Sequence, residues 1–248
     1  GKPLGVFWGA ETDGIYANWE EANASGIDGA APGEIKYVNH DVETDENGEP
    51  LERQQITFDD YVQLGDPNPD FTASINSDLS IKNWSLNILV TGQQGGDIFW
   101  VDSWPLQALS KSTNVLSSAY ANSWQAPLRY EGETGEFIYD EAVGQTAGVS
   151  QPAPLNDAPG GRAIESDRQV FDGSYLRIRN VNLGYTFRFK NRISLRMYLA
   201  GNNLYTLTNY PGNDPAVMTY NKSPQKRGVD FGGYPNARHY TLGLKLNF

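Results

Sequence analysis

Apolar and polar residues alternate along two adjacent segments, residues 71–82 and 84–92. A period of two residues is typical of a β-strand that turns one face toward an apolar environment. Only Lys82 and Asn83 separate the two runs, so the pattern predicts a β-hairpin with a tight turn. The apolar positions of this hairpin are Phe71, Ala73, Ile75, Leu79, Ile81, Trp84, Leu86, Ile88 and Val90.

A second pair of alternating segments covers residues 175–189 and 193–201, with a basic turn at 190–192 between them. The apolar positions before and after Asn180 are out of phase with each other. A phase change inside a strand indicates one extra residue, so we predict a β-bulge near Asn180.

The segment 240–248 alternates without interruption up to Phe248. In water, a strand with one fully apolar side would invite edge-to-edge pairing, whereas in a barrel immersed in lipid that side meets the membrane. We therefore predict that Thr241, Gly243, Lys245 and Asn247 face the barrel interior. The residues predicted to face lipid are Leu242, Leu244, Leu246 and Phe248.

Tight turns and long connections follow each other along the chain. Compact domains seldom contain irregular connections longer than about 15 residues, whereas outer-membrane barrels combine short periplasmic turns with long extracellular loops. The fold class predicted is all-β, an antiparallel transmembrane β-barrel segment with long extracellular loops. The predicted strands lie near residues 3–9, 71–82, 84–92, 175–189, 193–201 and 240–248, and the predicted loops are 10–70, 93–174 and 202–239.

The composition excludes several classes of protein. The chain has no cysteine, so it has neither disulfides nor cysteine-ligated metal sites. A formal net charge of -11 argues against nucleic acid as a partner, because binding to phosphates needs a basic surface. No run approaches the about 18 apolar residues of a membrane-spanning helix. A mean hydropathy of -0.53 is compatible with a β-barrel, whose strands alternate.

Ordered motifs along the chain resemble the C-terminal part of the SusC/RagA family of TonB-dependent outer-membrane transporters. Residues 172–181 read D-G-S-Y-L-R-I-R-N-V where the family has D-x-S-Y-L-R-L-R-N-V. Residues 32–37 read P-G-E-I-K-Y, similar to its P-G-D-I-K-Y. Further similar stretches are 5–16, 65–71, 201–206, 210–215 and 230–235.

The resemblance implies the last strands of a large barrel, of about 22 strands, in the cell outer membrane. Six predicted strands are fewer than the about eight that close a barrel, so we expect residues 1–248 to be the C-terminal portion of the barrel domain. The family's plug domain and TonB-contacting segment are expected to lie outside this chain. The resemblance also implies import of oligosaccharides, or of peptides, with a SusD-like surface lipoprotein as partner.

Three tryptophans in the connection 93–174 are candidate substrate-binding residues: Trp100, Trp104 and Trp124. A flat apolar ring on a loop can stack on the CH face of a sugar ring. The alternative, which we favour, is that these rings anchor the loop or pack against the partner lipoprotein.

The acidic run 41–49 is a weak candidate for a structural calcium ion, with Asp41, Glu43 and Asp45 as its ligands. Read as an EF-hand loop with Gly48 in its sixth place, the run has Gln54 where a bidentate glutamate belongs. We therefore favour a solvated acidic loop and expect no cofactor.

Two other classes of protein compete with a transporter segment. A secreted soluble β-sandwich that binds carbohydrate would also be acidic and rich in tryptophan. A hydrolase would need a facing pair of carboxylates. The glutamates between residues 131 and 136 are sequence neighbours in a Gly-rich stretch and do not form such a pair. We expect no enzymatic activity.

Overall fold

The computed structural model describes residues 1–107, 114–132, 134–139, 149–153, 164–190, 193–216 and 223–248. The chain divides into two compact units that alternate along the sequence. The first unit contains Gly1–Val6, Gly65–Trp100 and Phe171–Phe248, and the second contains Phe7–Leu64 and Val101–Val170. Among the described helices, none is long and apolar enough to cross a membrane.

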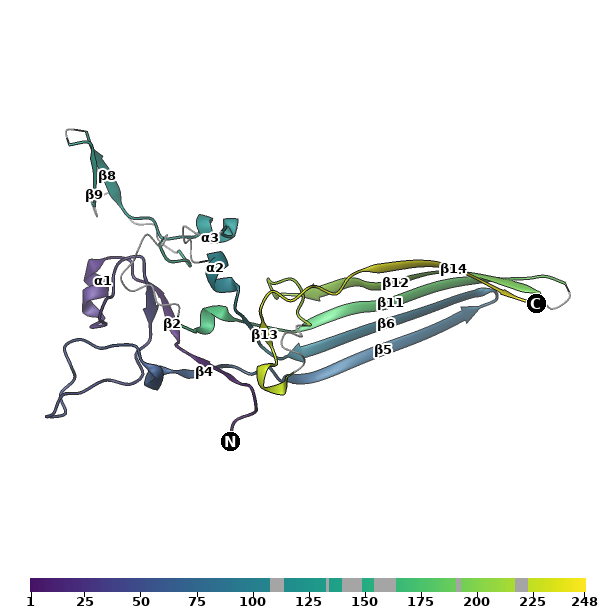
Figure 1. Cartoon of the computed structure of the whole chain (residues 1–248), viewed down its shortest axis with the longest axis horizontal. Coiled ribbons are helices and arrows are strands. Elements are labelled where there is room, and N and C mark those ends of the chain that lie inside the picture. Colours follow the sequence, from purple (N-terminus) through teal and green to yellow (C-terminus); the bar gives the residue numbers. More distant parts are fainter. Residues whose placement is uncertain (108–113, 133, 140–148, 154–163, 191–192, 217–222) are drawn as a thin grey trace. The chain divides into compact units, whose positions relative to one another are not determined.

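A five-stranded sheet dominates the first unit, and its order is β14-β12-β11-β6-β5. All neighbouring strands are antiparallel, and Figure 1 shows them side by side in a single layer. The strands are β5 (Pro69–Ile81), β6 (Trp84–Gly95), β11 (Tyr175–Arg188), β12 (Ser194–Thr208) and β14 (His239–Asn247). The predicted all-β, antiparallel fold class is confirmed.

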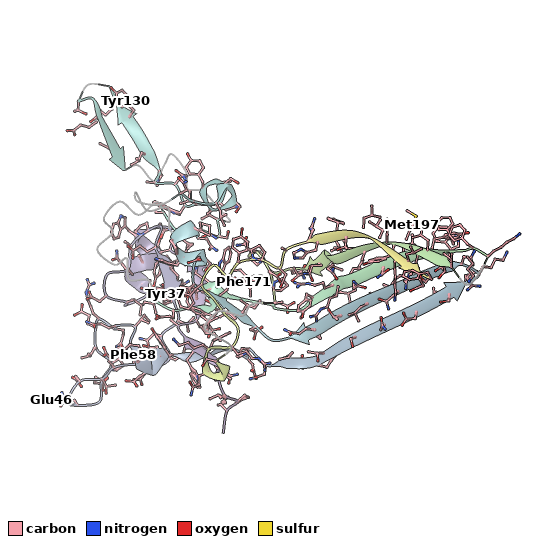
Figure 2. The ribbon with its side chains drawn as sticks, turned by 45° about the vertical axis from the view of Figure 1, so that its right-hand side comes forward. Tyr37, Glu46, Phe58, Tyr130, Phe171 and Met197 are labelled. Atoms are coloured by element: carbon pink, nitrogen blue, oxygen red, sulfur yellow. The ribbon has the colours of Figure 1, made fainter. Side chains whose placement is uncertain are left out.

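The pairing registers align the apolar residues of all five strands on one side of the sheet. Residues that pair directly lie on the same face. One row across the sheet is Leu79, Leu86, Leu183, Leu199 and Leu242, and the next is Ile81, Trp84, Tyr185, Met197 and Leu244. We call this side the apolar face, and Met197 projects from it in Figure 2.

The other side of the sheet, the polar face, carries mostly polar residues. One row across this face is Asp78, Asn87, Asn182, Ala200 and Thr241. The next row is Ser80, Ser85, Gly184, Tyr198 and Gly243.

Most side chains of the outer strands are exposed on both faces. In β5, every residue after Pro69 is exposed. A β-sandwich would bury one face of each sheet against the other sheet. The soluble β-sandwich alternative is therefore wrong for this chain.

A bulge interrupts β11 where the sequence predicted it. The register shifts between Ile178 and Asn180 against both neighbouring strands, so the predicted bulge is confirmed. Beyond the bulge, β12 continues to Thr208 rather than ending at the predicted residue 201, because Tyr205 and the residues after it pair with the start of β11.

The predicted strand at residues 3–9 is not part of this sheet. Only Phe7–Gly9 form a strand, β1, and it pairs with β4 (Val62–Gly65). Gly5 has a φ of 85°, which turns the chain before β1. Phe7 and Ala10 are buried, so the apolar residues that suggested a barrel strand contribute to the core instead.

Residues predicted as loops form most of the second unit. Its core contains Tyr16, Ala22, Ala119 and Trp124. Its elements are β2 (Thr12–Ile15), α1 (Trp19–Ala24), β3 (Ile35–Tyr37), η1 (Phe58–Asp60), α2 (Ser103–Gln107), α3 (Ser117–Ala121), β8 (Leu128–Glu131), β9 (Glu136–Tyr139) and η3 (Asp167–Gln169).

Asn18 caps the first helix of this unit. Its side chain accepts a hydrogen bond from the Glu21 backbone N–H, and the Glu21 carboxylate accepts the N–H of Ala17 at 2.8 Å. The first bond satisfies a backbone donor that the first turn of a helix leaves free, and the second holds the residue before the cap.

Short elements also occur in the connections next to the five-stranded sheet. They are β7 (Ile98–Trp100), β10 (Val170–Phe171), β13 (Val229–Asp230) and η4 (Pro224–Lys226). β7 lies between β10 and β13 in a small three-stranded sheet. The strand ends are therefore followed by ordered structure.

Candidate functional site

The polar face of the sheet carries an ion pair at the end from which the long connections leave. Arg177 of β11 pairs with Thr91 on one side and with Thr206 on the other, which places it on the polar face. Its Nη2 donates to Oδ1 of Asp214, and its Nε donates to the Thr206 hydroxyl at 2.9 Å. Because both side chains are largely buried, the attraction between their charges is weakly screened by solvent.

Asp214 also accepts hydrogen bonds from the connection before β14. Its Oδ2 accepts the backbone N–H of Asn236 at 3.0 Å and the Asn236 side-chain amide at 2.9 Å. Burial raises the pKa of Asp214, but these donors, the Ala216 N–H and Arg177 together lower it further, so the net shift is downward. The carboxylate therefore stays ionised and ties two parts of the connection to β11.

An aromatic cluster also lies within the first unit. The rings of Trp100, Phe171 and Tyr210 meet edge to face at centroid distances of 5.8, 6.0 and 6.2 Å. The Tyr210 hydroxyl donates to the buried Asp230 carboxylate at 2.6 Å. Trp100 is only 8% exposed, so its ring packs against protein groups and offers no free face to a sugar. The substrate-binding prediction for Trp100 does not fit this geometry.

Trp124 has a structural position in the second unit. It is 5% exposed, and its indole N–H donates to the Ala17 carbonyl at 3.3 Å. Gly33 lies directly under its ring, where a Cβ atom would come within 2.6 Å of the indole. Like Trp100, this residue fits the loop-anchoring alternative rather than sugar stacking.

Trp104 is partly exposed and lies in the second unit, beside the Arg168 side chain. Trp100 lies in the first unit, whereas Trp104 and Trp124 lie in the second. Its role in substrate binding stays a prediction.

The acidic loop is a hydrogen-bonded turn. The Asp45 carboxylate accepts the backbone N–H groups of Asn47 and Glu49 at 2.8 and 3.0 Å, and Gly48 adopts a φ of 83°. Glu46 lies at its tip and points away from the protein in Figure 2. No group of three or more acidic or histidine side chains with metal-binding geometry is found among the described residues, which include Asp41, Glu43 and Asp45.

Gln54 closes this loop. Its amide oxygen accepts the N–H of Glu43 at 2.8 Å, and its amide nitrogen donates to the Glu43 carbonyl at 3.0 Å. The side chain is 8% exposed. The residue that stands at the bidentate position of an EF-hand alignment therefore binds backbone groups.

Hydrogen-bonding side chains extend down the polar face toward the tight turns. Asn87 donates to Asn76 and to Asp78, both at 2.8 Å. Farther along, Arg196 donates to the Ser85 hydroxyl at 3.0 Å. The face thus presents amides, hydroxyls and charges, which bind polar ligands or polypeptide, and it lacks an arrangement for covalent chemistry among these residues.

Sequence reasoning missed Arg177, Asp214 and Arg196 as candidates. Arg177 and Asp214 lie in two separate motif stretches, and no sequence signal pairs them. Arg196 could have been found, because a cation on the polar positions of an alternating strand is directed toward the side away from lipid.

Comparisons with known proteins agree with this geometry. No family model matches the chain. TonB-dependent receptor P3 of Formosa agariphila is 31% identical over the whole chain, and TonB-dependent receptor SusC of Bacteroides thetaiotaomicron is 25% identical over 82% of it. The chain spans 22% and 18% of the lengths of these relatives, so it corresponds to about a fifth of each.

Solved structures of the RagAB peptide transporter have the same fold. One of them matches 98% of the chain and 23% of its own chain, with a TM-score of 0.65 and 21% identity. Another, the RagAB peptide importer in the closed-closed state, matches with a TM-score of 0.62 and 20% identity.

The fold and the two-faced sheet define a segment of an outer-membrane β-barrel. With the relatives described above, the chain belongs to the TonB-dependent receptors of the SusC/RagA type. Receptors of this type are outer-membrane proteins and are not enzymes.

Proposed function

We propose that the chain forms part of the wall and the extracellular mouth of a TonB-dependent nutrient importer. The importer takes up oligosaccharides or peptides across the outer membrane, together with a SusD-like lipoprotein.

The observation that carries this proposal is the separation of the two faces of the sheet. Five strands in register place apolar rows on one side and polar rows on the other. In a barrel, the apolar face meets lipid and the polar face lines the interior. Leu242, Leu244 and Leu246 lie on the apolar face and Phe248 continues their alternation, which supports the proposal that they face lipid.

The two outer strands support a larger barrel. β5 pairs only with β6, and β14 pairs only with β12, so each has an unpaired edge within the described residues. Unpaired backbone groups in hydrocarbon cost several kcal/mol each. We therefore infer that further strands of the receptor, outside residues 1–248, complete the barrel on both sides.

The direction of the chain follows from the turns. β5 and β6 meet at the tight turn Lys82–Asn83, and the C-terminus lies at the same end of the sheet (Figure 1). Short turns lie in the periplasm in outer-membrane barrels. In this orientation, the Arg177–Asp214 pair and the connections near it lie at the extracellular mouth, where a lipoprotein lid and the substrate would bind.

The names of the relatives support the partner and substrate classes. SusC gives its name to the class, and the structural neighbours are peptide transporters named RagAB. We therefore expect one SusD-like lipoprotein for each receptor chain, and an oligosaccharide or a peptide as the substrate. TonB is expected to bind a segment outside this chain.

Affinity purification of the complete receptor from its own membranes tests the proposal. We expect a surface lipoprotein to copurify at a one-to-one ratio, and mass spectrometry of the complex to find bound oligosaccharide or peptide. Cells that lack the receptor should lose uptake of that polymer, and uptake should also stop when the TonB-contacting segment is removed. A receptor that purifies alone and whose deletion changes no uptake would contradict the proposal.

A further inference from the structure

The end of the sheet with the tight turns is basic and contains no acidic residue. Its strands and turns belong to residues 79–96, 173–213 and 231–248, and none of these residues is an aspartate or a glutamate. Lys82 lies in the turn between β5 and β6, Lys190 follows β11, and both are exposed. The net charge of the whole chain is -11, so this end differs in sign from the chain as a whole.

Neither lysine is neutralised by the part of the chain that the structure describes. No ion pair there includes Lys82 or Lys190, and neither side chain makes a hydrogen bond to a described residue. The pairing of β6 with β11 brings their surroundings together, because the Thr186 N–H donates to the Asn83 carbonyl at 2.9 Å. Two unpaired ammonium groups therefore lie at the ends of neighbouring strands.

The apolar face is hollowed at this same end. The hollow has a volume of about 610 Å³, within the range of about 300–1,000 Å³ that is typical of ligand pockets. Three of its rings meet edge to face: Trp84 with Tyr185 at a centroid distance of 4.8 Å, and Tyr185 with Phe187 at 4.7 Å. Figure 2 shows Met197, which also lines the hollow, near this end of the sheet. The aliphatic part of the lining is Leu183, Met197, Leu199 and Leu242.

The polar group of the hollow lies at the level of the turns. The Tyr185 hydroxyl accepts a hydrogen bond from the Asn83 side-chain amide at 3.5 Å. A phenol that accepts one hydrogen bond keeps its own proton to donate. The two lysines are each within three residues of a ring that lines the hollow. An apolar surface along the strands thus ends in one donor and two cations.

We propose that this hollow and the two lysines bind one anionic phospholipid of the inner, periplasmic leaflet of the outer membrane. The proposal rests on the proposed function, because only a barrel wall turns its apolar face to lipid. An acyl chain fills the hollow, the ammonium groups of Lys82 and Lys190 donate to the anionic headgroup, and the Tyr185 hydroxyl donates to an ester or phosphate oxygen. Basic residues at a membrane surface each raise the affinity for anionic lipid about fivefold.

Charge and position favour this occupant over the others that an apolar surface could have. A neutral lipid would fill the hollow but leave both cations without a counter-charge. A second copy of the chain would have the same orientation in the membrane, so its lysines would lie at the same depth and repel those of the first. The acyl anchor of a surface lipoprotein enters the membrane from the opposite, extracellular side.

Bromine-labelled lipids test the site in the complete receptor. Bromine on an acyl chain quenches the fluorescence of a tryptophan that it contacts, and Trp84 is an exposed part of the hollow. The difference between the unmodified receptor and a Trp84→Phe variant isolates the signal of this ring. In vesicles that contain phosphatidylcholine and phosphatidylglycerol, one of them brominated, we expect the site to prefer phosphatidylglycerol about 25-fold, or about fivefold for each lysine.

Charge-neutral variants show whether the lysines cause this preference. Lys82→Gln and Lys190→Gln should each lower it to about fivefold, and the double variant should remove it. The matched control is Lys245→Gln, which removes a cation from the polar face at the same end of the sheet and should leave the preference unchanged. For the hollow itself, we expect Met197→Phe to weaken quenching of Trp84 by either lipid. The control Leu79→Phe lies on the same face outside the hollow and should not weaken it.

The outcomes separate the two proposals. If both lipids quench Trp84 equally, or if the double lysine variant keeps the preference, the phospholipid site is wrong and the wall assignment stands. If no brominated lipid quenches Trp84 in a monomeric receptor with the heat-modified mobility of an intact barrel, the apolar face does not meet lipid and both proposals fail. The same result in a dimeric receptor would assign the hollow to a second copy and overturn the phospholipid site alone.

Discussion

At the scale of residues, buried aspartates organise the irregular segments of this chain. Asp60 accepts the backbone N–H groups of Thr57, His40 and Asp41 at 2.7–2.9 Å, so it joins two segments about 20 residues apart. The buried Asp230 carboxylate accepts the Tyr210 hydroxyl and the backbone N–H of Gly233. The sequence did not predict these roles, because a carboxylate shows no periodicity and its donors are distant along the chain.

Asp60 makes the stability of the second unit depend on pH. Burial raises its pKa, but the N–H donors of Thr57, Asp41 and His40 lower it further, so the net value lies below the ordinary 3.8. A group with a lowered folded-state pKa stabilises the fold above its unfolded pKa, and this contribution is lost as the pH falls through the folded-state value. We expect trypsin to cleave at the exposed Arg53 faster after incubation at acid pH.

An Asp60→Asn variant tests the same carboxylate at neutral pH. Asparagine keeps one acceptor oxygen but cannot carry the charge, so we expect a loss of about 1–3 kcal/mol in the stability of the second unit. Cleavage at Arg53 should be faster and no longer depend on acid. The matched control is the exposed neighbour, Asp59→Asn; if both variants behave alike, the role given to Asp60 is wrong.

At the scale of elements, the alternation of apolar and polar residues predicted the strands wherever it continued along the chain. The bulge near Asn180 is visible because apolar residues continue on both sides of it. The end of β12 was missed because Asn203, with a φ of 51°, breaks the alternation before the strand resumes. Residues 3–9 were assigned to the wrong sheet because a short apolar run does not reveal its pairing partner.

A charge on the apolar face should prevent normal assembly. We expect Leu244→Arg in the complete receptor to cost about 2–4 kcal/mol if the position is near the bilayer midplane. Thr241→Arg on the polar face is the matched control and should assemble normally. The resistance of the barrel to heat in gel mobility measures both, and equal resistance would show that the faces are assigned wrongly.

The Arg177–Asp214 pair should control the order of the connection between β12 and β14. Removing one partner leaves a buried, uncompensated charge, at a cost of about 3–5 kcal/mol. We expect Arg177→Met and Asp214→Asn each to speed hydrogen exchange at residues 209–216. In the double variant, the loss of protection against exchange, expressed as a free energy, should be smaller than the sum of the losses in the two single variants. Additive losses would mean that the two side chains act independently.

At the scale of the whole molecule, the sequence motifs predicted the family, and the alternation predicted a barrel wall. Neither predicted that residues 7–64 and 101–170 would build a unit with its own core. Tyr16 and Trp124 belong to that core although they are more than 100 residues apart. Cores of this kind depend on contacts between distant segments, which a single sequence does not reveal.

The unpaired edges of the sheet predict how residues 1–248 behave alone. With β5 and β14 each lacking one neighbour, we expect this chain in detergent to aggregate or to stay unfolded. Circular dichroism and heat-modified mobility provide the measurement. A stable monomer with β-barrel mobility would show that no further strands are required.

The pairing of β6 with β11 also sets the order of folding. The two strands are neighbours in the sheet, but the chain between them includes residues 101–170 of the second unit. Closing a flexible loop of about 70 residues costs about 4 kcal/mol in chain entropy before any pairing contact forms. The contact between the Trp100 and Phe171 rings holds the two ends of this segment together. Collapse of the inserted segment should therefore come first, and the joining of the β5–β6 and β11–β12 hairpins should be the slow step.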